Sequence, residues 1–379
     1  MRYLIVGAGL SGAVIAERLA ATMNARVTVI EKRDHIAGNC YDYIDAETGI
    51  LMNKYGAHLF HTNNETVWKY ITSFDEWVRW EHKVVSLVDN KYVSVPVNIT
   101  TINELCGENL QTEGEVAEWL GGVQVKYAEG EIQNSEQMAK SRIGEELYEK
   151  LIKEYTFKQW NKYPGELDKS VLARIPVRPN FDTRYFSDKY QALPKKGYTH
   201  FFERLLDHPN IEVRLNTDYF DVPDRTEYDA VIFTGPVDSY FQGYDKLEYR
   251  SIDFQIQKIS NMNYFQPNSV VNYPGPEVPF TRIVEYKHFL NQQSKDTVIV
   301  TETTNDVGEP YYPVPNKRNM DLYETYRALA LAEESKGVYF IGRLANYKYF
   351  NMDEAIANSL RFFDDVLSKN CDLKQELRP

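Results

Sequence analysis

The sequence predicts an α/β fold in which a discontinuous Rossmann-like domain carries a helical insertion domain and an antiparallel β-sheet domain. A short apolar strand pattern at residues 3–6 runs directly into a glycine turn and a helical pattern, which is how a parallel nucleotide-binding sheet begins. Strand patterns suited to the same sheet return only after residue 210, with helical periodicity and proline-interrupted strands between. A chain of 379 residues is long enough for several domains.

The glycine turn after the first strand predicts a site for a dinucleotide. In the run Gly7-Ala8-Gly9-Leu10-Ser11-Gly12, Gly7 allows the turn and Gly9 lets the backbone approach a pyrophosphate. Gly12 lets the next helix, expected at 13–21, pack on the strand. Glycine turns before helices are common, so the motif needs the support of its neighbours.

The acid that ends the second predicted strand supplies that support. This strand, 26–30, is followed by Glu31, and a carboxylate there accepts the hydroxyls of an adenosine ribose and repels a ribose 2′-phosphate. NAD and FAD both satisfy this arrangement. The run after Glu31 adds a second glycine turn, and such an extension resembles FAD proteins of the glutathione-reductase type. We therefore expect FAD, bound by Gly7, Gly9, Ser11, Gly12, Glu31, Lys32, Gly38 and Asn39.

Later strand patterns make the cofactor domain discontinuous. The patterns at 211–215 and 228–235 suit a return to the first sheet, and a last strand at 338–341 leads through Gly342 to a closing helix at 353–367. We expect the FAD-binding domain at 1–78, 191–236 and 336–379. The helical domain, with a mobile substrate loop, is expected at 99–165, and the antiparallel sheet domain at 79–98, 166–190 and 237–335.

Periodicity predicts the other two domains. Between 102 and 160 apolar residues recur at spacings of three and four, which indicates helices. A hairpin at 83–88 and 92–96, and short runs between 247 and 300 that are separated by proline and glycine, indicate antiparallel strands. Further helices are expected at 64–74 and 201–206.

Composition limits the function classes. Hydrophobic residues at 43% and charged residues at 26% are ordinary for a soluble globular protein. The net charge of −12 argues against a nucleic-acid partner, so an anionic ligand must be bound by individual arginines. No apolar run reaches about 18 residues and no leader precedes the first strand, so we expect a cytoplasmic protein without a membrane span or signal peptide.

Cysteine and histidine usage argues against a metal. Cys40, Cys106 and Cys371 lack metal-ligand spacing and are expected to be reduced structural thiols. His58 and His61 follow a glycine three positions apart, but no third ligand follows, so a loop beside the cofactor is the better interpretation. The 28 tyrosines suit the stacking of a base or the lining of a sugar site, although packing in the core explains most of them.

The motifs taken together resemble a known family. GAGLSGAV, HIAGN, YGAHLFHTN, YTFKQW, IPVR, RYFSDKYQALPKKGYT, FTGPVD, LEYRS, PFTRIVE, EPYYPV and GRLANYKYFNMD occur in this order over nearly the whole chain. They are similar to the motifs of the bacterial UDP-galactopyranose mutases, and the KQW, YRS, TRI and PYYPV segments go beyond what FAD proteins share in general. The resemblance implies interconversion of UDP-galactopyranose and UDP-galactofuranose, by a protein that is commonly a homodimer, for cell-surface polysaccharide synthesis.

The resemblance also implies the chemistry. Such mutases use reduced FAD, so an external reductant such as NAD(P)H is needed to activate them. N5 of the reduced flavin attacks the anomeric carbon, UDP leaves, and the flavin–sugar iminium allows the ring to open and to close as the furanose before UDP returns, with no net redox change. Two arginines suit the leaving diphosphate because each carries a permanent charge and a planar donor fork. By their motifs these are Arg178 and Arg282.

Other roles follow from matching motif positions. His58 and His61 match the loop beside the flavin ring, and we count them with the two arginines as catalytic. The substrate-binding set is Tyr155, Trp160, Arg178, Tyr190, Arg282, Tyr312, Tyr349 and Asn351. Beyond the glycine turns, the cofactor-binding set is His58, Val213, Thr234, Gly235, Arg250, Arg343, Met352 and Asp353.

Four positions depart from the family pattern, namely Ala37, Glu154, Pro179 and Asn351. They remove no group that the flavin chemistry requires, but they leave open whether UDP-N-acetylgalactosamine or UDP-arabinose is also a substrate. Two other functions share the opening motif. A flavin oxidoreductase, such as an amine oxidase or desaturase, would turn over with net flavin reduction, and a flavin-bound interaction protein would not turn over at all.

Overall fold

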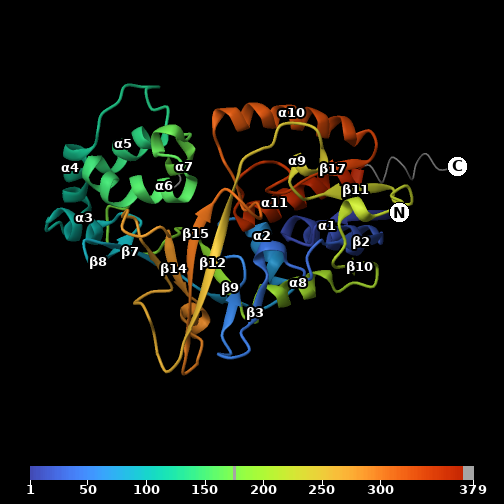
Figure 1. The fold of residues 1–379 in the computed structure, drawn as a ribbon, viewed down its shortest axis with the longest axis horizontal. Coiled ribbons are helices and arrows are strands. Elements are labelled where there is room, and N and C mark those ends of the chain that lie inside the picture. Colours follow the sequence, from blue (N-terminus) through green and yellow to red (C-terminus); the bar gives the residue numbers. More distant parts are fainter. Residues whose placement is uncertain (174–175, 370–379) are drawn as a thin grey trace.

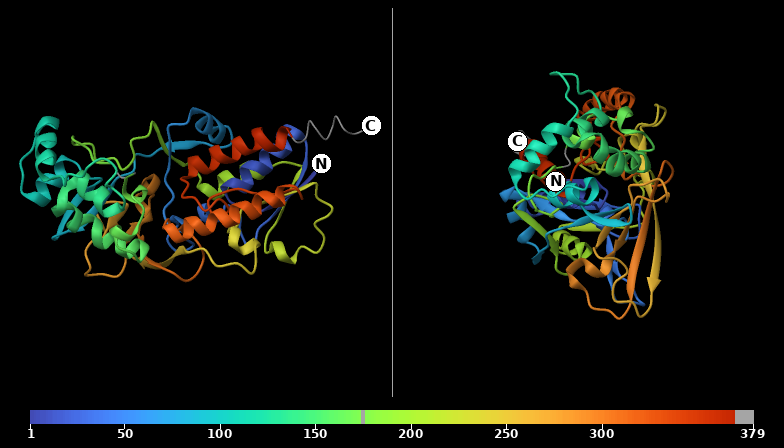
Figure 2. Two further views of the ribbon diagram at one scale, coloured as in Figure 1. Left: turned by 90° about the horizontal axis from the view of Figure 1, so that it is seen from above. Right: turned by 90° about the vertical axis from the view of Figure 1, so that its left-hand side faces the viewer.

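The computed structural model describes residues 1–173 and 176–369, which form three regions (Figure 1). A parallel sheet with its helices lies at one end of the elongated molecule and a group of helices lies at the other, and the long strands β12 and β15 run between and below them (Figures 1 and 2). The structure confirms the predicted fold class, because one parallel sheet and one largely antiparallel sheet are both present.

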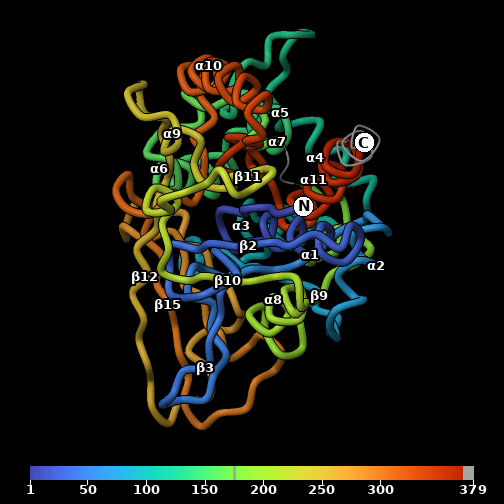
Figure 3. The backbone as a smooth tube through the Cα atoms, turned by 90° about the vertical axis from the view of Figure 1, so that its right-hand side faces the viewer, coloured from blue at the N-terminus to red at the C-terminus, as the bar shows by residue number. Residues whose placement is uncertain are grey.

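The parallel sheet is assembled from five distant segments of the chain, in the order β10-β2-β1-β11-β17. Its strands are β1 (Arg2–Val6), β2 (Arg26–Ile30), β10 (Ile211–Arg214), β11 (Ala230–Phe233) and β17 (Val338–Phe340). Figure 3 shows β11, β2 and β10 running alongside one another. β1 pairs with both β2 and β11, so the glycine turn that follows β1 lies at the middle of the carboxyl edge, where ligands of open parallel sheets bind.

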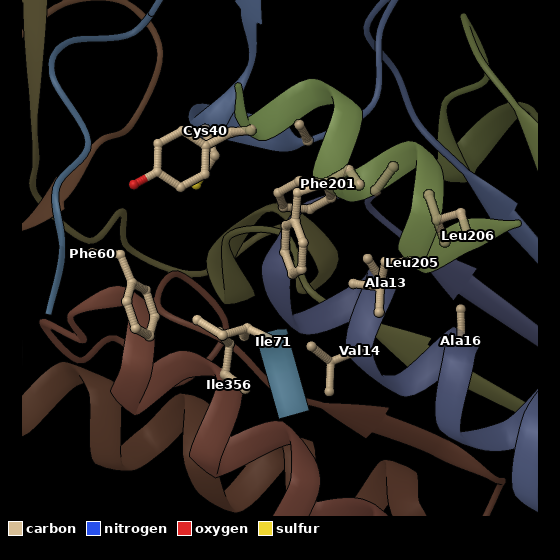
Figure 4. Close-up of a cluster of buried hydrophobic side chains, with 14 of the residues drawn as sticks. Ala13, Val14, Ala16, Cys40, Phe60, Ile71, Phe201, Leu205, Leu206 and Ile356 are labelled. Atoms are coloured by element: carbon tan, nitrogen blue, oxygen red, sulfur yellow. The ribbon is translucent and has the colours of Figure 1, made fainter. Parts of the chain in front are cut away.

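Helices cover both faces of this sheet. On one face the packed helices are α1 (Leu10–Met23), α2 (Glu65–Thr72), α8 (Tyr198–Leu206) and α11 (Met352–Phe362). Figure 4 shows the small side chains of α1 facing Phe201 and Leu205 of α8, with Ile71 and Ile356 close by. The other face is buried by a second cluster that includes Leu4, Val231 and Phe233. α9 (Val237–Tyr240) and α10 (Lys317–Glu334) lie beyond it.

A seven-stranded sheet in the order β16-β12-β15-β14-β13-β7-β8 forms the second region. Its strands are β7 (Val84–Val88), β8 (Lys91–Val95), β12 (Tyr249–Ile259), β13 (Val270–Asn272), β14 (Arg282–Glu285), β15 (Thr297–Asn305) and β16 (Tyr312–Pro313). The sheet is antiparallel as predicted except between β13 and β7, which are parallel. That pair joins the early hairpin, β7–β8, to strands that come about 180 positions later in the chain.

The third region is helical. Its helices are α3 (Ile99–Cys106), α4 (Glu113–Val123), α5 (Ser135–Tyr148), α6 (Glu154–Trp160) and α7 (Ser170–Ala173). α5 continues into α6 through a π-helical turn at Glu149–Lys153. Apolar side chains of α3, α4 and α5, which include Val116, Ile143 and Leu147, form a core together with Val88 of β7 and Val93 of β8.

Two small sheets complete the fold, and neither is predicted from the sequence pattern. One pairs β3 (Asp42–Ile44) with β4 (Leu51–Asn53), and the other has the order β5-β9-β6. The latter strands are β5 (Phe60–Thr62), β6 (Trp77–Arg79) and β9 (Tyr190–Pro194). β5 carries His61, so this sheet holds one of the predicted site histidines. Cys371 lies outside the described residues.

Candidate functional site

The glycine turns of the cofactor motif are packed too closely for larger side chains. Gly7 has a φ of +104°, and a Cβ at Gly12 would lie 2.0 Å from the Gly7 carbonyl oxygen. Gly38 faces Gly9, and a Cβ on Gly38 would lie 2.9 Å from the Gly9 Cα. Ala37, one of the four departures from the family pattern, takes a left-handed φ of 73° directly before Gly38. The two turns therefore lie against each other without side chains between them, which leaves their backbone accessible to a pyrophosphate at close range.

Glu31 lies beside the first turn. Its carboxylate accepts hydrogen bonds from the backbone N–H groups of Ala8 (3.0 Å) and Arg33 (3.0 Å), which fixes it at the end of β2. Lys32 and Arg33 each form an ion pair with Glu309, both at 3.2 Å. Arg33 also donates to the Oδ1 atom of Asn39 at 3.0 Å. The predicted ribose acceptor and the second glycine turn are thus held together.

Residues from two later strands converge on the same edge. The Thr234 hydroxyl, after β11, donates to the Val6 carbonyl at 2.7 Å, and a Cβ on Gly7 would lie 2.3 Å from the Thr234 oxygen. After β17, a Cβ on Gly342 would lie 3.1 Å from the Ser11 oxygen. Gly235 follows Thr234 directly, and Arg343 follows Gly342. Val213 lies on the edge strand β10 opposite Val29, directly before Arg214, whose carbonyl accepts a hydrogen bond from the Glu31 N–H at 2.9 Å.

Arg343 begins a cluster of arginines and tyrosines. Its guanidinium donates to the carbonyl of Phe350 at 3.0 Å. It also lies 5.1 Å from the ring centre of Tyr349 and 5.7 Å from that of Tyr312. These two rings are stacked with centres 5.6 Å apart. The cluster therefore starts directly beside the glycine turns that are predicted to bind the cofactor.

Arg282 also lies near Tyr312. The Nε atom of Arg282 donates to Glu302 Oε2 at 2.6 Å, and Glu302 is buried. Burial opposes the charge of Arg282, but Glu302 together with Tyr155 and Tyr312 raises the pKa of the guanidinium above its ordinary value. Burial and Tyr349 raise the pKa of Tyr312 to about 12, and burial also raises that of Tyr155. At neutral pH the cluster thus combines permanent cations with protonated hydroxyl donors, which suits an anionic ligand.

The two predicted histidines have different environments. Nδ1 of His58 lies 2.8 Å from the Gly56 carbonyl, and the Tyr198 hydroxyl donates to the backbone carbonyl of His58 at 2.9 Å. Burial, with the nearby charges of Arg343 and Arg282, lowers the pKa of His58 to about 4, so the ring is neutral. Nδ1 of His61 lies 3.0 Å from Asp188, and its ring stacks on Phe186 at 3.7 Å. Over the described residues, no group of three or more His, Cys, Asp or Glu side chains could hold a metal ion.

The start of α11 borders the cofactor turns. Asn351 is the residue before the helix and forms a capping box with Glu354. The side chain of Met352 lies 3.8 Å from the buried Cys40 sulfur, measured between sulfur atoms. Asp353 accepts a hydrogen bond from the Thr62 hydroxyl at 2.8 Å, which connects α11 to the strand that carries His61.

Trp160 ends α6 and is buried. It packs with Tyr148 and Leu167, and Tyr312 and Tyr349 pack against the same group of side chains. Trp160 also lines a cavity of about 580 Å³ together with Glu309. The cavity beside Trp160 therefore extends to Glu309, which forms ion pairs with Lys32 and Arg33. These two residues directly follow Glu31, the predicted ribose acceptor.

Two predicted site residues have their described contacts elsewhere. Nη1 of Arg178 forms an ion pair with Asp182 at 2.5 Å, and the Arg178 backbone N–H donates to Val97. The Tyr190 hydroxyl donates to Glu65 at 2.8 Å, and the Tyr190 ring stacks on Trp68. The diphosphate role of Arg178 and the nucleotide role of Tyr190 stay predictions.

Arg250 of β12 contacts the end of α6. Its guanidinium donates to the carbonyls of Gln159 (3.0 Å) and Lys158 (3.4 Å) and forms an ion pair with Asp306. The cofactor role of Arg250 stays a prediction. Sequence patterns also miss Glu302, although an acid at an inward position of a strand pattern is a signal for a buried ion pair.

Comparisons with known proteins agree with these features. A family model described as UDP-galactopyranose mutase matches residues 150–349, and one described as NAD(P)-binding Rossmann-like domain matches residues 5–74. A protein of Klebsiella pneumoniae named "Probable UDP-galactopyranose mutase" is 40% identical over 96% of this chain and 94% of its own length. A dTDP-fucopyranose mutase of Escherichia coli is 35% identical over 95% of this chain and 96% of its own length.

A third relative and the solved structures extend the comparison. A UDP-galactopyranose mutase of Mycoplasma genitalium is 34% identical over 96% of this chain and 94% of its own length. The crystal structure of a reduced UDP-galactopyranose mutase has a TM-score of 0.76 at 17% identity, covering 97% of this chain and 96% of the other. An oxidoreductase of Methanosarcina mazei has a TM-score of 0.61 at 10% identity, covering 96% and 100%. These structural likenesses show the fold, and the matches in sequence show that the chain belongs to the UDP-galactopyranose mutase family.

Proposed function

We propose that the protein interconverts UDP-galactopyranose and UDP-galactofuranose with FAD as its cofactor. The observation that carries this proposal is the cluster in which Tyr312 lies near both Arg343, at the cofactor turns, and Arg282. A UDP-sugar needs cations and hydroxyl donors for its diphosphate, and the sugar must lie close to the cofactor. This cluster offers the cations and the hydroxyl donors, and it lies beside the edge of the parallel sheet where the cofactor is expected.

The residues present fit FAD. Side chains in place of Gly9 and Gly38 would fill the space between the two turns that the FAD pyrophosphate needs. The carboxylate of Glu31 is held beside the first turn, where it can accept hydrogen bonds from the ribose hydroxyls. Reduced FAD, when bound, supplies a nucleophilic N5 for the anomeric carbon of the sugar. We propose that it is reduced by an external donor such as NAD(P)H.

The chain's own residues bind and orient the substrate. Arg282 holds a diphosphate oxygen while Tyr155, Tyr312 and Tyr349 donate to others, so the leaving UDP stays in place until the ring closes again. Arg178 adds a second cation when it leaves Asp182. His58 stays neutral at physiological pH because its pKa is about 4. Its backbone carbonyl is fixed by the Tyr198 hydroxyl, and this backbone helps to orient the flavin ring.

The test is direct. FAD-loaded protein, reduced with dithionite under anaerobic conditions, should convert UDP-galactofuranose to UDP-galactopyranose, as followed by chromatography. The oxidised protein should be inactive. A reduced, fully loaded protein without turnover would contradict the activity, whereas equal turnover of the oxidised protein would contradict the role of reduced flavin.

The two arginines are tested by substitution. Arg178→Ala and Arg282→Ala should each lower kcat/KM by at least about a hundredfold, the value typical for loss of a donor set at developing charge. Their FAD content should be normal. Near-normal turnover of either folded variant would mean that this arginine has been wrongly assigned.

A second candidate substrate is a dTDP-6-deoxyhexose, because the Escherichia coli relative at 35% identity is named a dTDP-fucopyranose mutase. Parallel assays with dTDP-fucopyranose, UDP-galactopyranose, UDP-N-acetylgalactosamine and UDP-arabinose rank the substrates by kcat/KM. We propose the UDP-galactose pair as the best of them. A higher kcat/KM for the dTDP-sugar would reassign the substrate and leave the ring-contraction chemistry in place.

The wider setting is also a proposal. We propose a cytoplasmic homodimer whose product is a precursor of cell-surface polysaccharide, with the FAD-binding, helical and sheet domains divided as the sequence predicts. Among residues 1–173 and 176–369, no helix is both long enough and apolar enough to pass through a membrane.

A further inference from the structure

Lys158 of α6 is bonded to a loop of the sheet region. Its ammonium donates to three backbone carbonyls, those of Tyr273, Gly275 (2.8 Å) and Val278 (3.3 Å). A lysine ammonium has three donors, so these carbonyls use all of them. The three acceptors belong to the loop that leads from β13 to β14, and β14 begins with Arg282.

The same helix is held from its carboxyl end. Arg250 of β12 donates to the carbonyls of Lys158 and Gln159, and the Thr304 hydroxyl of β15 donates to the Lys158 carbonyl as well. Asn161, the residue after the helix, donates from its side chain to Asp306 at 2.7 Å. The last carbonyls of a helix have no partner within the helix, and here the sheet supplies them.

α6 and β14 each carry a residue of the candidate site. Tyr155 is on α6 and Arg282 is on β14, and each affects the pKa of the other. Trp160, at the end of α6, packs with Tyr312 and Tyr349. The bonds of Lys158 therefore join the two elements whose separation sets the space between Tyr155 and Arg282.

Both elements have contacts that do not involve Lys158. Trp160 of α6 is buried in a cluster with Tyr148 and Leu167. The loop between β13 and β14 is closed by a hydrogen bond from the Tyr273 N–H to the Thr281 carbonyl at 2.9 Å. The ammonium connects two elements that are each held by other contacts, so its effect should fall on their relative position.

We propose that Lys158 is a positioning residue that fixes α6 against the β13–β14 loop and thereby sets the affinity of the site for the nucleotide. The inference rests on the proposed function for the identity of the ligand, UDP. It concerns a side chain that is placed outside the cluster of Arg282, Tyr155 and Tyr312 and acts through them.

Lys158→Met tests the inference, because methionine keeps an unbranched chain and removes the donors. Lys153→Met is the matched control, since Lys153 lies on the turn before α6 and its ammonium pairs with Glu149 (2.8 Å) at the surface. Lys158→Arg, which keeps a cation with several donors, is the conservative variant. FAD content, Tm, the Kd of UDP, KM and kcat are measured for each.

For Lys158→Met we expect the Kd of UDP and KM to rise on the order of tenfold, because the contacts of the site with UDP are misplaced, while kcat and FAD content change little. Lys158→Arg should recover most of the affinity, and Lys153→Met should equal the wild type. An unchanged UDP Kd in folded Lys158→Met would overturn the inference. If the methionine variant does not fold, Lys158→Gln, with two donors, decides by the same measure.

A ligand-free measurement separates this inference from the proposed function. In Lys158→Met without nucleotide, amide hydrogen exchange should increase in residues 154–160 and 273–281 together and stay unchanged in α4 and β1. Unchanged exchange in those two segments would overturn the inference whatever the enzyme's activity. A wild type that lacks mutase turnover but binds UDP would instead overturn only the proposed function.

Discussion

The buried ion pair between Arg282 and Glu302 allows a quantitative prediction for Glu302→Gln. The Glu302 side chain is only 2% exposed, whereas that of Arg282 is 27% exposed. Removing one partner of a buried pair typically costs about 3–5 kcal/mol, because the remaining charge is left without compensation. Since Arg282 keeps some contact with water, we expect Glu302→Gln to lower the free energy of unfolding by about 2–3 kcal/mol, at or below the lower end of that range.

The same substitution should strengthen UDP binding. If Arg282 binds the diphosphate as proposed, the wild-type diphosphate must share Arg282 with Glu302, whereas in Glu302→Gln the diphosphate supplies the missing negative charge. If the ligand recovers about half of the lost stability, the Kd of UDP falls on the order of tenfold. The Tm without ligand should fall by several degrees, and saturating UDP should raise the Tm of the variant more than that of the wild type.

The assay is thermal unfolding with and without UDP, combined with a direct titration of UDP. Glu285→Gln is the control, because Glu285 is fully buried on β14, the strand of Arg282, but accepts hydrogen bonds from the backbone N–H groups of Phe265 and Gln266. It should lower the Tm without changing the Kd of UDP. Weaker UDP binding by Glu302→Gln, with an unchanged Tm, would refute the reasoning.

Three other outcomes are expected. Asp182→Asn should tighten UDP binding about threefold to tenfold, because it weakens the ion pair that Arg178 must leave in its proposed diphosphate role. A higher Kd of UDP in this variant would count against the diphosphate role of Arg178. Ala37→Gly should raise stability by up to about 1 kcal/mol, since alanine is strained at a φ of 73°, and a lower Tm would contradict this. Burial, aided by Arg282 and His61, lowers the pKa of His82 to about 3. Below about pH 6.5 the unfolded chain binds a proton there that the folded chain does not, so stability should fall with pH down to about 3, and denaturation curves of His82→Gln should depend less on pH than those of the wild type.

The cofactor motif could be predicted because its information is local. Strand, glycine turn, helix and the acid at Glu31 lie within the first 31 residues, and each has a sequence signature that does not depend on the rest of the chain. The later strands β11 and β17 were expected from apolar runs before glycine. Their place in the parallel sheet is consistent with the long chain segments that precede them, because parallel strands can be joined only by long connections.

The polar contacts between regions could not be predicted. A strand pattern indicates which side of the sheet Arg250 faces, but not that Gln159, 91 positions earlier, lies opposite it. The same holds for Lys158 and its three carbonyls. Helix α10 is missing from the prediction because few of its side chains are fully buried, Asn319 and Tyr326 among the described residues, which leaves too weak an apolar stripe.

The order of strands in the parallel sheet has a consequence for biosynthesis. Tyr3 of β1 pairs with Ala230 of β11, so the central strand has no partner on one side until most of the chain has left the ribosome. β17 and Arg343 come later still. The helical region, whose core lies between Val88 and Leu151, can fold from local contacts in the meantime. We expect the nascent chain to expose an unpaired apolar strand edge for much of its synthesis, so that chaperone binding, rather than the chemistry of the finished site, limits the yield of active protein.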